Sequence, residues 1–199
     1  MIREQSVNEM LACFERIPVK PGDCFVVPAG TPHAIGAGIF MMELQEPTDW
    51  VVRCETTTTD GRPLQPDACF MGLDLETCLD VFNYDSLPVE EVRRRWHQKP
   101  RVINQGAGFC DEEIIADAYH QFFRLHRMRG KGVASWASGE LTLLVALKGG
   151  GTLQGGSNQC KVRAGETWLL PGSVAEWTWI DPTETWEILL AKTPKKRPN

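Results

Sequence analysis

The sequence predicts a mainly β protein made of two related modules, the first of them incomplete, with short linking helices. The first indication is the segment 19–36, which reads as a turn, a buried strand, a second turn and a histidine. The second is the return of this pattern at 162–177, with Gly165 in place of Gly22 and a proline six positions later in each copy. A glycine before an acidic residue can turn the chain at positive φ, and a proline ends strand pairing. Two copies therefore predict two modules.

Residues 1–17 are predicted as an N-terminal helix. Ser6 and Glu9 have the spacing of a capping box, and apolar residues recur on one helical face as far as Ile17. From 18 to 66 the sequence predicts strands joined by turns, because short runs rich in β-branched and aromatic residues alternate with Gly, Pro, Thr and Asp. The strands expected here cover 25–27, 39–44 and 50–53.

Residues 67–99 are predicted as a helical linker. Asp74 is a candidate N-cap for one short helix, and a second helix is expected from Pro88, with acidic residues in its first turn and basic residues in its last. Residues 100–192 are predicted as the second module, and the proline-rich basic segment 193–199 as a disordered tail. The strands expected in the second module cover 118–128, 140–148, 167–170 and 186–192.

Four residues of the first module are candidates for chemistry. His33 lies between two turns, where a neutral imidazole can bind a divalent metal ion; the alternative is a structural histidine. Glu43 and Gln45 share one face of the expected strand and are candidates for substrate binding in a polar cavity, or else face solvent. Arg53 lies in an apolar run, where it could hold an anion or stabilise charge on an oxygen; the alternative is an ion pair with Glu55 or a surface position.

The two copies differ at the position of the imidazole. Glu176 of the second copy stands where His33 stands in the first, so the second module is expected to be metal-free. His120 and His126 fall on one face of the strand expected over 118–128, where about 20 Å of extended chain would separate them. That spacing excludes a shared metal ion, and neither residue is expected to form a site. His97 is expected to cap a helix end.

Composition excludes several classes of function. The net charge of −5 argues against a nucleic-acid partner, because such proteins concentrate Lys and Arg against phosphates. The seven cysteines form no Cys-x-x-Cys pair and no signal peptide precedes them, which favours reduced thiols and a cytoplasmic location. No apolar run approaches the roughly 18 residues of a membrane span. A soluble protein that binds neither nucleic acid nor membrane is expected.

The segment 21–36, followed by Glu-Leu-Gln-Glu at 43–46 and by Val-Arg at 52–53, resembles the class I mannose-6-phosphate isomerases of the cupin superfamily. The resemblance implies a cupin-like double-stranded β-helix in which His33 is a zinc ligand and Arg53 is catalytic. It also implies a sugar-phosphate substrate, with mannose 6-phosphate and fructose 6-phosphate interconverted through an enediol.

The sequence departs from this family near its N-terminus. A Gln-x-His segment and a glutamate ligand of the family have no counterpart here, so the resemblance implies a family member that lacks its N-terminal part, with 18–66 as the C-terminal half of a first cupin module. The other zinc ligands are then expected upstream of this chain, and activity of the isolated chain is expected to be impaired, because catalytic zinc usually needs three protein ligands. A half module also leaves strand edges unsatisfied, which predicts pairing with a second copy or with an N-terminal fragment.

Two other functions remain open at this point. A non-catalytic cupin-like module or subunit that binds a sugar or sugar phosphate would not need the missing ligands. A metal-dependent oxygenase on the same fold is less favoured, because no His-x-Asp/Glu pair accompanies His33.

Overall fold

The computed structural model describes residues 1–48 and 50–195, in two compact units that divide between His97 and Gln98. The first unit contains four short helices, α1 (Val7–Ala12), α2 (Pro66–Phe70), α3 (Leu75–Leu79) and α4 (Val89–Trp96). The strands of the described residues all lie in the second unit: β1 (Arg101–Gly106), β2 (Phe109–Glu113), β3 (Arg124–Ala137), β4 (Thr142–Lys148), β5 (Gly150–Gly155), β6 (Asn158–Arg163), β7 (Thr167–Leu170) and β8 (Glu176–Lys192). The predicted mainly β fold class, with short helices, is confirmed.

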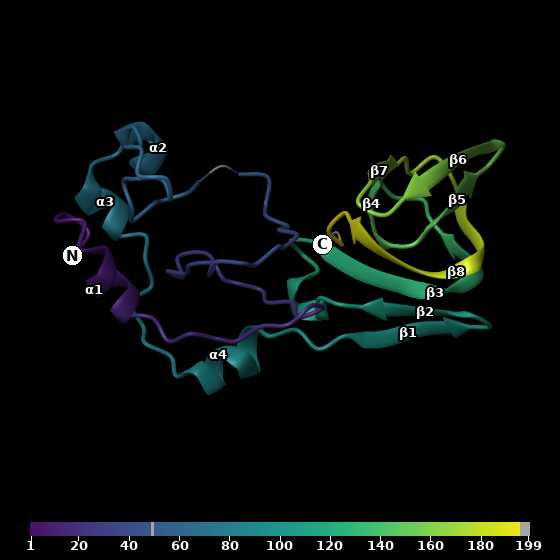
Figure 1. The fold of residues 1–199 in the computed structure, drawn as a ribbon, viewed down its shortest axis with the longest axis horizontal. Coiled ribbons are helices and arrows are strands. Elements are labelled where there is room, and N and C mark those ends of the chain that lie inside the picture. The colour runs from purple at the N-terminus through teal and green to yellow at the C-terminus, as the bar shows by residue number, and fades with distance from the viewer. Residues whose placement is uncertain (49, 196–199) are drawn as a thin grey trace. The chain divides into compact units, whose positions relative to one another are not determined.

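The second unit is one curled antiparallel sheet (Figure 1). Its strands follow the order β1-β2-β3-β8-β4-β7, and the β5–β6 hairpin joins through β8. β8 pairs with β3 along its length, while β5 and β4 pair with successive parts of its other edge. The register shifts between Lys131 and Gly132, and such an irregularity increases local bending. The N-terminal part of β8 therefore pairs with β5, and its C-terminal part pairs with β4.

Apolar side chains from the inner face of this sheet form the core of the second unit. Trp179, Leu144 and Ile188 are fully buried, and the ring of Trp179 lies 5.9 Å from that of Trp186. Alternate residues of β4 and of the C-terminal part of β8 are buried, as expected for strands with one face on a core. In the described part of the first unit, the buried apolar residues are Met10, Val26, Cys69 and Cys78.

The helices expected after residue 70 are confirmed. The Asp74 side chain accepts a hydrogen bond from the Thr77 backbone N–H at 3.0 Å and so caps α3, and Pro88 immediately precedes α4. The N-terminal helix α1 is shorter than the helix expected within residues 1–17, and Ser6 makes no side-chain cap. Only Met10 is buried in α1, so the later apolar positions have no packing surface to hold another turn.

The strands expected in the first module are not formed, and this part of the prediction is wrong. In residues 1–48 and 50–97 the extended pairing is limited to two isolated bridges, Phe25 with His97 and Thr57 with Pro63. A strand needs a hydrogen-bonding neighbour along its length, and the apolar runs at 39–44 and 50–53 have none here. The expected strand over 118–128 begins only at Arg124, because a 3-10 helix occupies Asp117–Tyr119.

The two copies of the repeated pattern form the same turn. Gly22 and Gly165 have φ values of 91° and 88°. In the first copy the Asp23 backbone N–H donates to Lys20 O at 3.1 Å, and in the second Glu166 N–H donates to Arg163 O at 3.1 Å. Each acidic side chain also accepts from the backbone N–H three residues earlier. The Lys20 backbone N–H is the largest cause of the lowered pKa of the Asp23 carboxyl.

Replacing Gly165 by alanine should lower the free energy of unfolding of the second unit by about 1–2 kcal/mol, because an L-residue pays roughly that amount in the left-handed region. No atom lies within 4 Å of an added Cβ, so the cost comes from the backbone alone. Urea denaturation measures the change. Gly36→Ala, at a position with equal space and without positive φ, should leave stability unchanged; an equal loss there would contradict the explanation.

All seven cysteines are free thiols with very different access to reagents. Cys13 is exposed, whereas Cys69 and Cys78 are fully buried. Burial raises the pKa of the Cys24 thiol to about 11, so roughly one molecule in a thousand carries the thiolate at pH 8. Iodoacetamide at pH 8 should therefore label Cys13 first and Cys24 much later. Mass spectrometry of labelled peptides measures the order, and early labelling of Cys69 or Cys78 in the folded protein would contradict the structure.

The C-terminal segment is described as far as Lys195. Thr193 O accepts a hydrogen bond from Arg124 Nε at 2.9 Å, and Lys195 N–H donates to His120 O at 2.9 Å. Residues 196–199 of the tail expected over 193–199 lie outside the described residues. In the described part of the chain, no helix has the length and apolar character needed to cross a membrane.

Candidate functional sites

Arg53 is held by carbonyl groups of α2 and lines a cavity of about 460 Å³. Its backbone N–H donates to Cys69 O at 2.9 Å, and its Nη1 donates to Ala68 O. Asp67 is the carboxylate of the cavity lining, so the cavity presents one guanidinium and one carboxylate. The remaining lining residues are Val51, Ala68, Met71 and Gly72. This cavity combines an ordered cation with enough volume for a small phosphorylated ligand.

The exposed His33 ring is oriented by a local hydrogen bond. Its Nδ1 lies 2.9 Å from Thr31 O, and because a carbonyl only accepts, Nδ1 is the protonated nitrogen. Nε2 is then the nitrogen with a lone pair. A backbone carbonyl bonded to one ring nitrogen is the usual arrangement behind a metal-ligating histidine.

Glu43 and Gln45 are both exposed, and the strand expected to carry them is absent. In the described part of the chain, neither is joined to His33 or Arg53 by a hydrogen bond or an ion pair. Their part in substrate binding stays a prediction. The alternative partner of Arg53 in an ion pair, Glu55, is not its partner here, because the guanidinium bonds Ala68 O.

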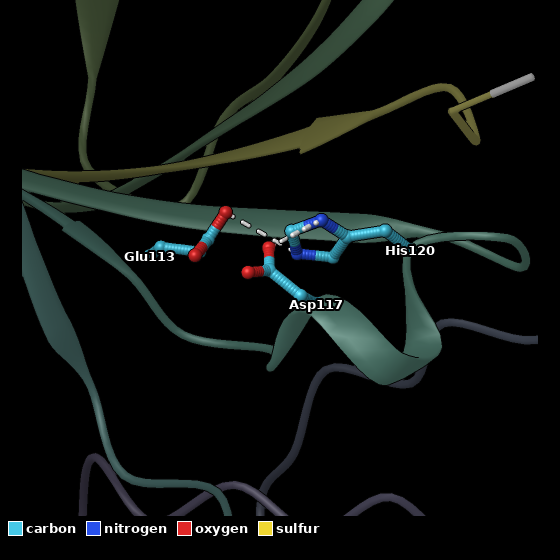
Figure 2. Close-up of side chains that lie close together, drawn as sticks. All are labelled: Glu113, Asp117 and His120. Carbon is cyan, nitrogen blue, oxygen red and sulfur yellow. Dashed lines mark ion pairs between the residues drawn. The ribbon is translucent and has the colours of Figure 1, made fainter.

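The second unit holds a group of metal-ligating side chains that the sequence did not predict. Glu113 ends β2, Asp117 begins the 3-10 helix, and His120 follows that helix as its C-terminal residue. One ligand atom from each lies within 4.8 Å of the others (Figure 2). His120 Nε2 lies 2.8 Å from Ile115 O and 3.2 Å from Glu113 Oε1, and its Nδ1 lies 3.1 Å from Asp117 Oδ1.

Two cations border this group. Arg101 bonds Glu113 Oε2 and lies 3.7 Å from Asp117 Oδ2, and the bond to Glu113 raises the pKa of the Arg101 guanidinium. Lys195 Nζ lies 4.0 Å from Asp117 Oδ1. His120 and Glu113 are buried, whereas the Asp117 side chain is 70% exposed. The group therefore has a buried side and a solvent side.

His120 was wrongly predicted to share a strand face with His126. The 3-10 helix turns the chain before β3, so His120 returns to Glu113, while His126 lies on β3 with Nδ1 3.2 Å from Asp111 Oδ1. The spacing of Asp117 and His120 is the signal that could have found the group, because residues three apart meet on one helical turn.

A second cavity, of about 470 Å³, lies in the second unit at Glu176, the position that corresponds to His33 in the repeat. Its lining includes neither histidine nor cysteine and comprises Gln154, Gly156, Ser173, Val174, Ala175, Glu176 and Thr178. Glu176 is the single charged group of this lining.

Comparison with known proteins points to one group of enzymes. No protein-family model matches the chain. It is 29% identical over 178 residues to the mannose-6-phosphate isomerase ManA of Bacillus subtilis, covering 89% of this chain and 51% of ManA. It is 28% identical over 167 residues to the mannose-6-phosphate isomerase of Streptococcus mutans, covering 81% of this chain and 46% of that enzyme. The chain thus spans about half the length of these relatives.

The solved structures support the fold. The crystal structure of the mannose 6-phosphate isomerase from Bacillus subtilis matches with a TM-score of 0.51 and 13% sequence identity. The match covers 70% of this chain and 39% of that protein. The chain is therefore a distant relative, by sequence, of mannose-6-phosphate isomerases, and it has a mainly β, cupin-like fold.

Proposed function

We propose that this chain is part of a sugar-phosphate isomerase that interconverts mannose 6-phosphate and fructose 6-phosphate. The observation that carries the proposal is sequence similarity over 81–89% of the chain to relatives named as this isomerase. The cupin-like fold is consistent with it, although fold alone would not define an activity.

Arg53 and its cavity provide the chemistry that such a substrate needs. A guanidinium binds phosphate oxygens through two parallel hydrogen bonds, and it stabilises an oxygen that gains negative charge. Arg53 is fixed by the Ala68 carbonyl at the wall of the cavity, with the Asp67 carboxylate in the same lining. We assign Arg53 to the substrate anion or to the enediolate oxygen, in agreement with its predicted catalytic role.

The reaction requires a proton to move between neighbouring carbons of the open-chain sugar. A base removes the proton from C2 of open-chain mannose 6-phosphate, the electrons of that C–H bond form the C1–C2 double bond, and the π electrons of the C1 carbonyl move to O1, which takes a proton to give the enediol. The hydroxyl on C2 then loses its proton as the C2 carbonyl forms, and the electrons of the C1–C2 double bond take up a proton at C1. No oxidant or reductant is needed, because C1 is reduced as C2 is oxidised.

The described residues around His33 do not complete a zinc site. Across residues 1–48 and 50–195, the group of three ligand side chains that could hold a metal ion is Glu113, Asp117 and His120, without His33. The His33 tautomer suits a metal ligand, but one imidazole is short of the three protein ligands of a catalytic zinc. We therefore propose His33 as a zinc ligand only together with ligands from outside the described residues.

Exposed apolar side chains in the first unit support the predicted association. They lie in the region whose expected strands lack neighbours, and they include Ile35, Ile39, Phe40, Met41, Met42, Trp50 and Val51. We propose that a second copy or an N-terminal fragment supplies the missing strands, because unpaired apolar segments favour strand addition. Light scattering should show an associated species. A well-behaved monomer that binds no hydrophobic dye would contradict this.

Sugar-phosphate recognition can be tested separately from turnover. The protein should bind mannose 6-phosphate at least about tenfold more tightly than mannose, because the phosphate supplies the charge that a guanidinium recognises. Isothermal titration calorimetry measures both affinities. Equal affinity for the two sugars would contradict the substrate class, and tight binding without any turnover would indicate a non-catalytic module.

A further inference from the structure

We propose that Glu113, Asp117 and His120 form a binding site for a divalent transition-metal ion in the second unit, distinct from His33. The isomerase proposal gives these three residues no role, and all three belong to the second compact unit. The inference depends on the protonation pattern that the contacts of His120 impose.

The buried imidazole of His120 has a defined tautomer when neutral. Its Nε2 lies 2.8 Å from Ile115 O, and a carbonyl oxygen can only accept, so Nε2 carries the proton. Glu113 Oε1, at 3.2 Å from the same nitrogen, is a second acceptor for that N–H. Nδ1 must then present a lone pair.

That lone pair is directed at another acceptor. His120 Nδ1 is buried and has no hydrogen-bond partner among the described residues, although Asp117 Oδ1 lies 3.1 Å away. The residue is only 3% exposed, so water does not satisfy this nitrogen easily. Two facing acceptors need a positive species between them. A metal ion at about 2.0–2.2 Å from both atoms fits, since tetrahedral geometry places two such ligands roughly 3.3 Å apart.

The ligand set indicates the kind of ion. One imidazole nitrogen and two carboxylates suit Zn²⁺ and neighbouring transition ions better than Mg²⁺ or Ca²⁺, which prefer oxygen alone. Glu113 can supply the third ligand atom by leaving the Nε2–H of His120, which Ile115 O then accepts alone. The exposed side of Asp117 gives the ion a path from solvent, and a fourth position remains for water.

The bordering cations are compatible with this site. Arg101 bonds Glu113 Oε2 and leaves Oε1 directed at His120, as a supporting residue orients a metal ligand. Lys195 is exposed and 4.0 Å from Asp117, so it can move away when an ion arrives. The competing explanation is a proton on Nδ1, which would make the group an ion-pair network.

Nitrogen-15 NMR of the histidine rings in the full chain separates these explanations. Adding Zn²⁺ should move the His120 Nδ1 resonance from the position of an unprotonated nitrogen, while the His126 ring should not respond. The readout is specific to one ring, so zinc taken up by thiols does not affect it. A His120 Nδ1 that is unmoved by Zn²⁺, or protonated before and after the addition, would overturn the proposal.

Asp117→Asn provides the matched variant, because this exposed side chain can be changed without disturbing the core. It should weaken zinc binding at His120 by about tenfold or more, given that loss of supporting groups alone costs 10–100-fold. Asp60→Asn, another exposed carboxylate paired with an arginine, should leave the affinity unchanged. Equal affinity in wild type and Asp117→Asn would overturn the proposal. Neither result depends on isomerase activity.

Discussion

Replacing Trp179 by alanine should lower the free energy of unfolding of the second unit by about 3–5 kcal/mol. The side chain is fully buried in the main hydrophobic cluster, where it packs against Trp186. β8 carries it between β3 and β5, so its removal leaves a cavity where three strands meet. Urea denaturation followed by circular dichroism measures the loss. Trp50→Ala, at a residue 75% exposed, should change stability by no more than about 0.5 kcal/mol.

The neighbour of Trp179 gives a stricter version of this test. A Cβ added at Gly151 would lie 2.6 Å from the Trp179 ring, so Gly151→Ala should destabilise the wild-type protein. The same change should cost much less in the Trp179→Ala background, where the ring is gone. Additive losses in the double-mutant cycle would show that the two residues are not in contact and would contradict the packing.

Replacing Arg53 by methionine should reduce the turnover of mannose 6-phosphate by about 100–1,000-fold, as expected when one group that stabilises developing charge is removed. Arg53→Lys should lose less, because lysine keeps the charge but not the planar fork. Coupled assay of fructose 6-phosphate formation measures both variants. The methionine change is not expected to unfold the first unit, because the side chain is exposed.

A matched change distinguishes the role of Arg53 from a general effect of charge. Arg62 is an exposed arginine of the same unit, paired with Asp60. Arg62→Met removes one positive charge and should leave turnover unchanged. Equal losses in Arg53→Met and Arg62→Met would contradict a specific role for Arg53.

The sequence predicts only some strands of the second unit, those over 140–148, 167–170 and 186–192, and it gives no bounds for β1, β2, β5 and β6. The strand over 167–170 was placed at its observed bounds, and the turn at Gly165 has the positive φ that its Gly-Glu pair indicated. The strands at 140–148 and 186–192 lie within or close to β4 and β8. In these segments the alternation of apolar and polar residues agrees with the strand pairing of the folded unit. Alternation predicts a strand most reliably when the two agree.

In the first unit, strand-like composition alone is not sufficient to predict strands. The turn at Gly22 formed as expected, since its hydrogen bonds join residues three apart. The runs at 39–44 and 50–53 have strand-like composition, but a strand also requires partners that no local signal supplies. Glu43 and Gln45 were assigned to one strand face by alternation, so their expected grouping depended on that strand.

The group around His120 was missed for a different reason. Strand alternation over 118–128 predicts His120 on the same strand face as His126, about 20 Å away, and does not predict the short 3-10 turn that redirects the chain. Its carboxylate partner Glu113 lies on β2, which pairs antiparallel with β3. The group therefore became visible only when the turn and the strand pairing were both known.

The most direct test of the proposed function is an NMR assay that monitors the conversion of mannose 6-phosphate by the purified protein in the presence of Zn²⁺. The proposal predicts that fructose 6-phosphate forms faster than in a protein-free sample, with the chain alone or mixed with the half of Bacillus subtilis ManA that this chain does not match, and that Arg53→Met gives no excess conversion. The proposed function would be contradicted if conversion ran at the protein-free rate both with the chain alone and with the mixture, and if no binding of mannose 6-phosphate were detectable.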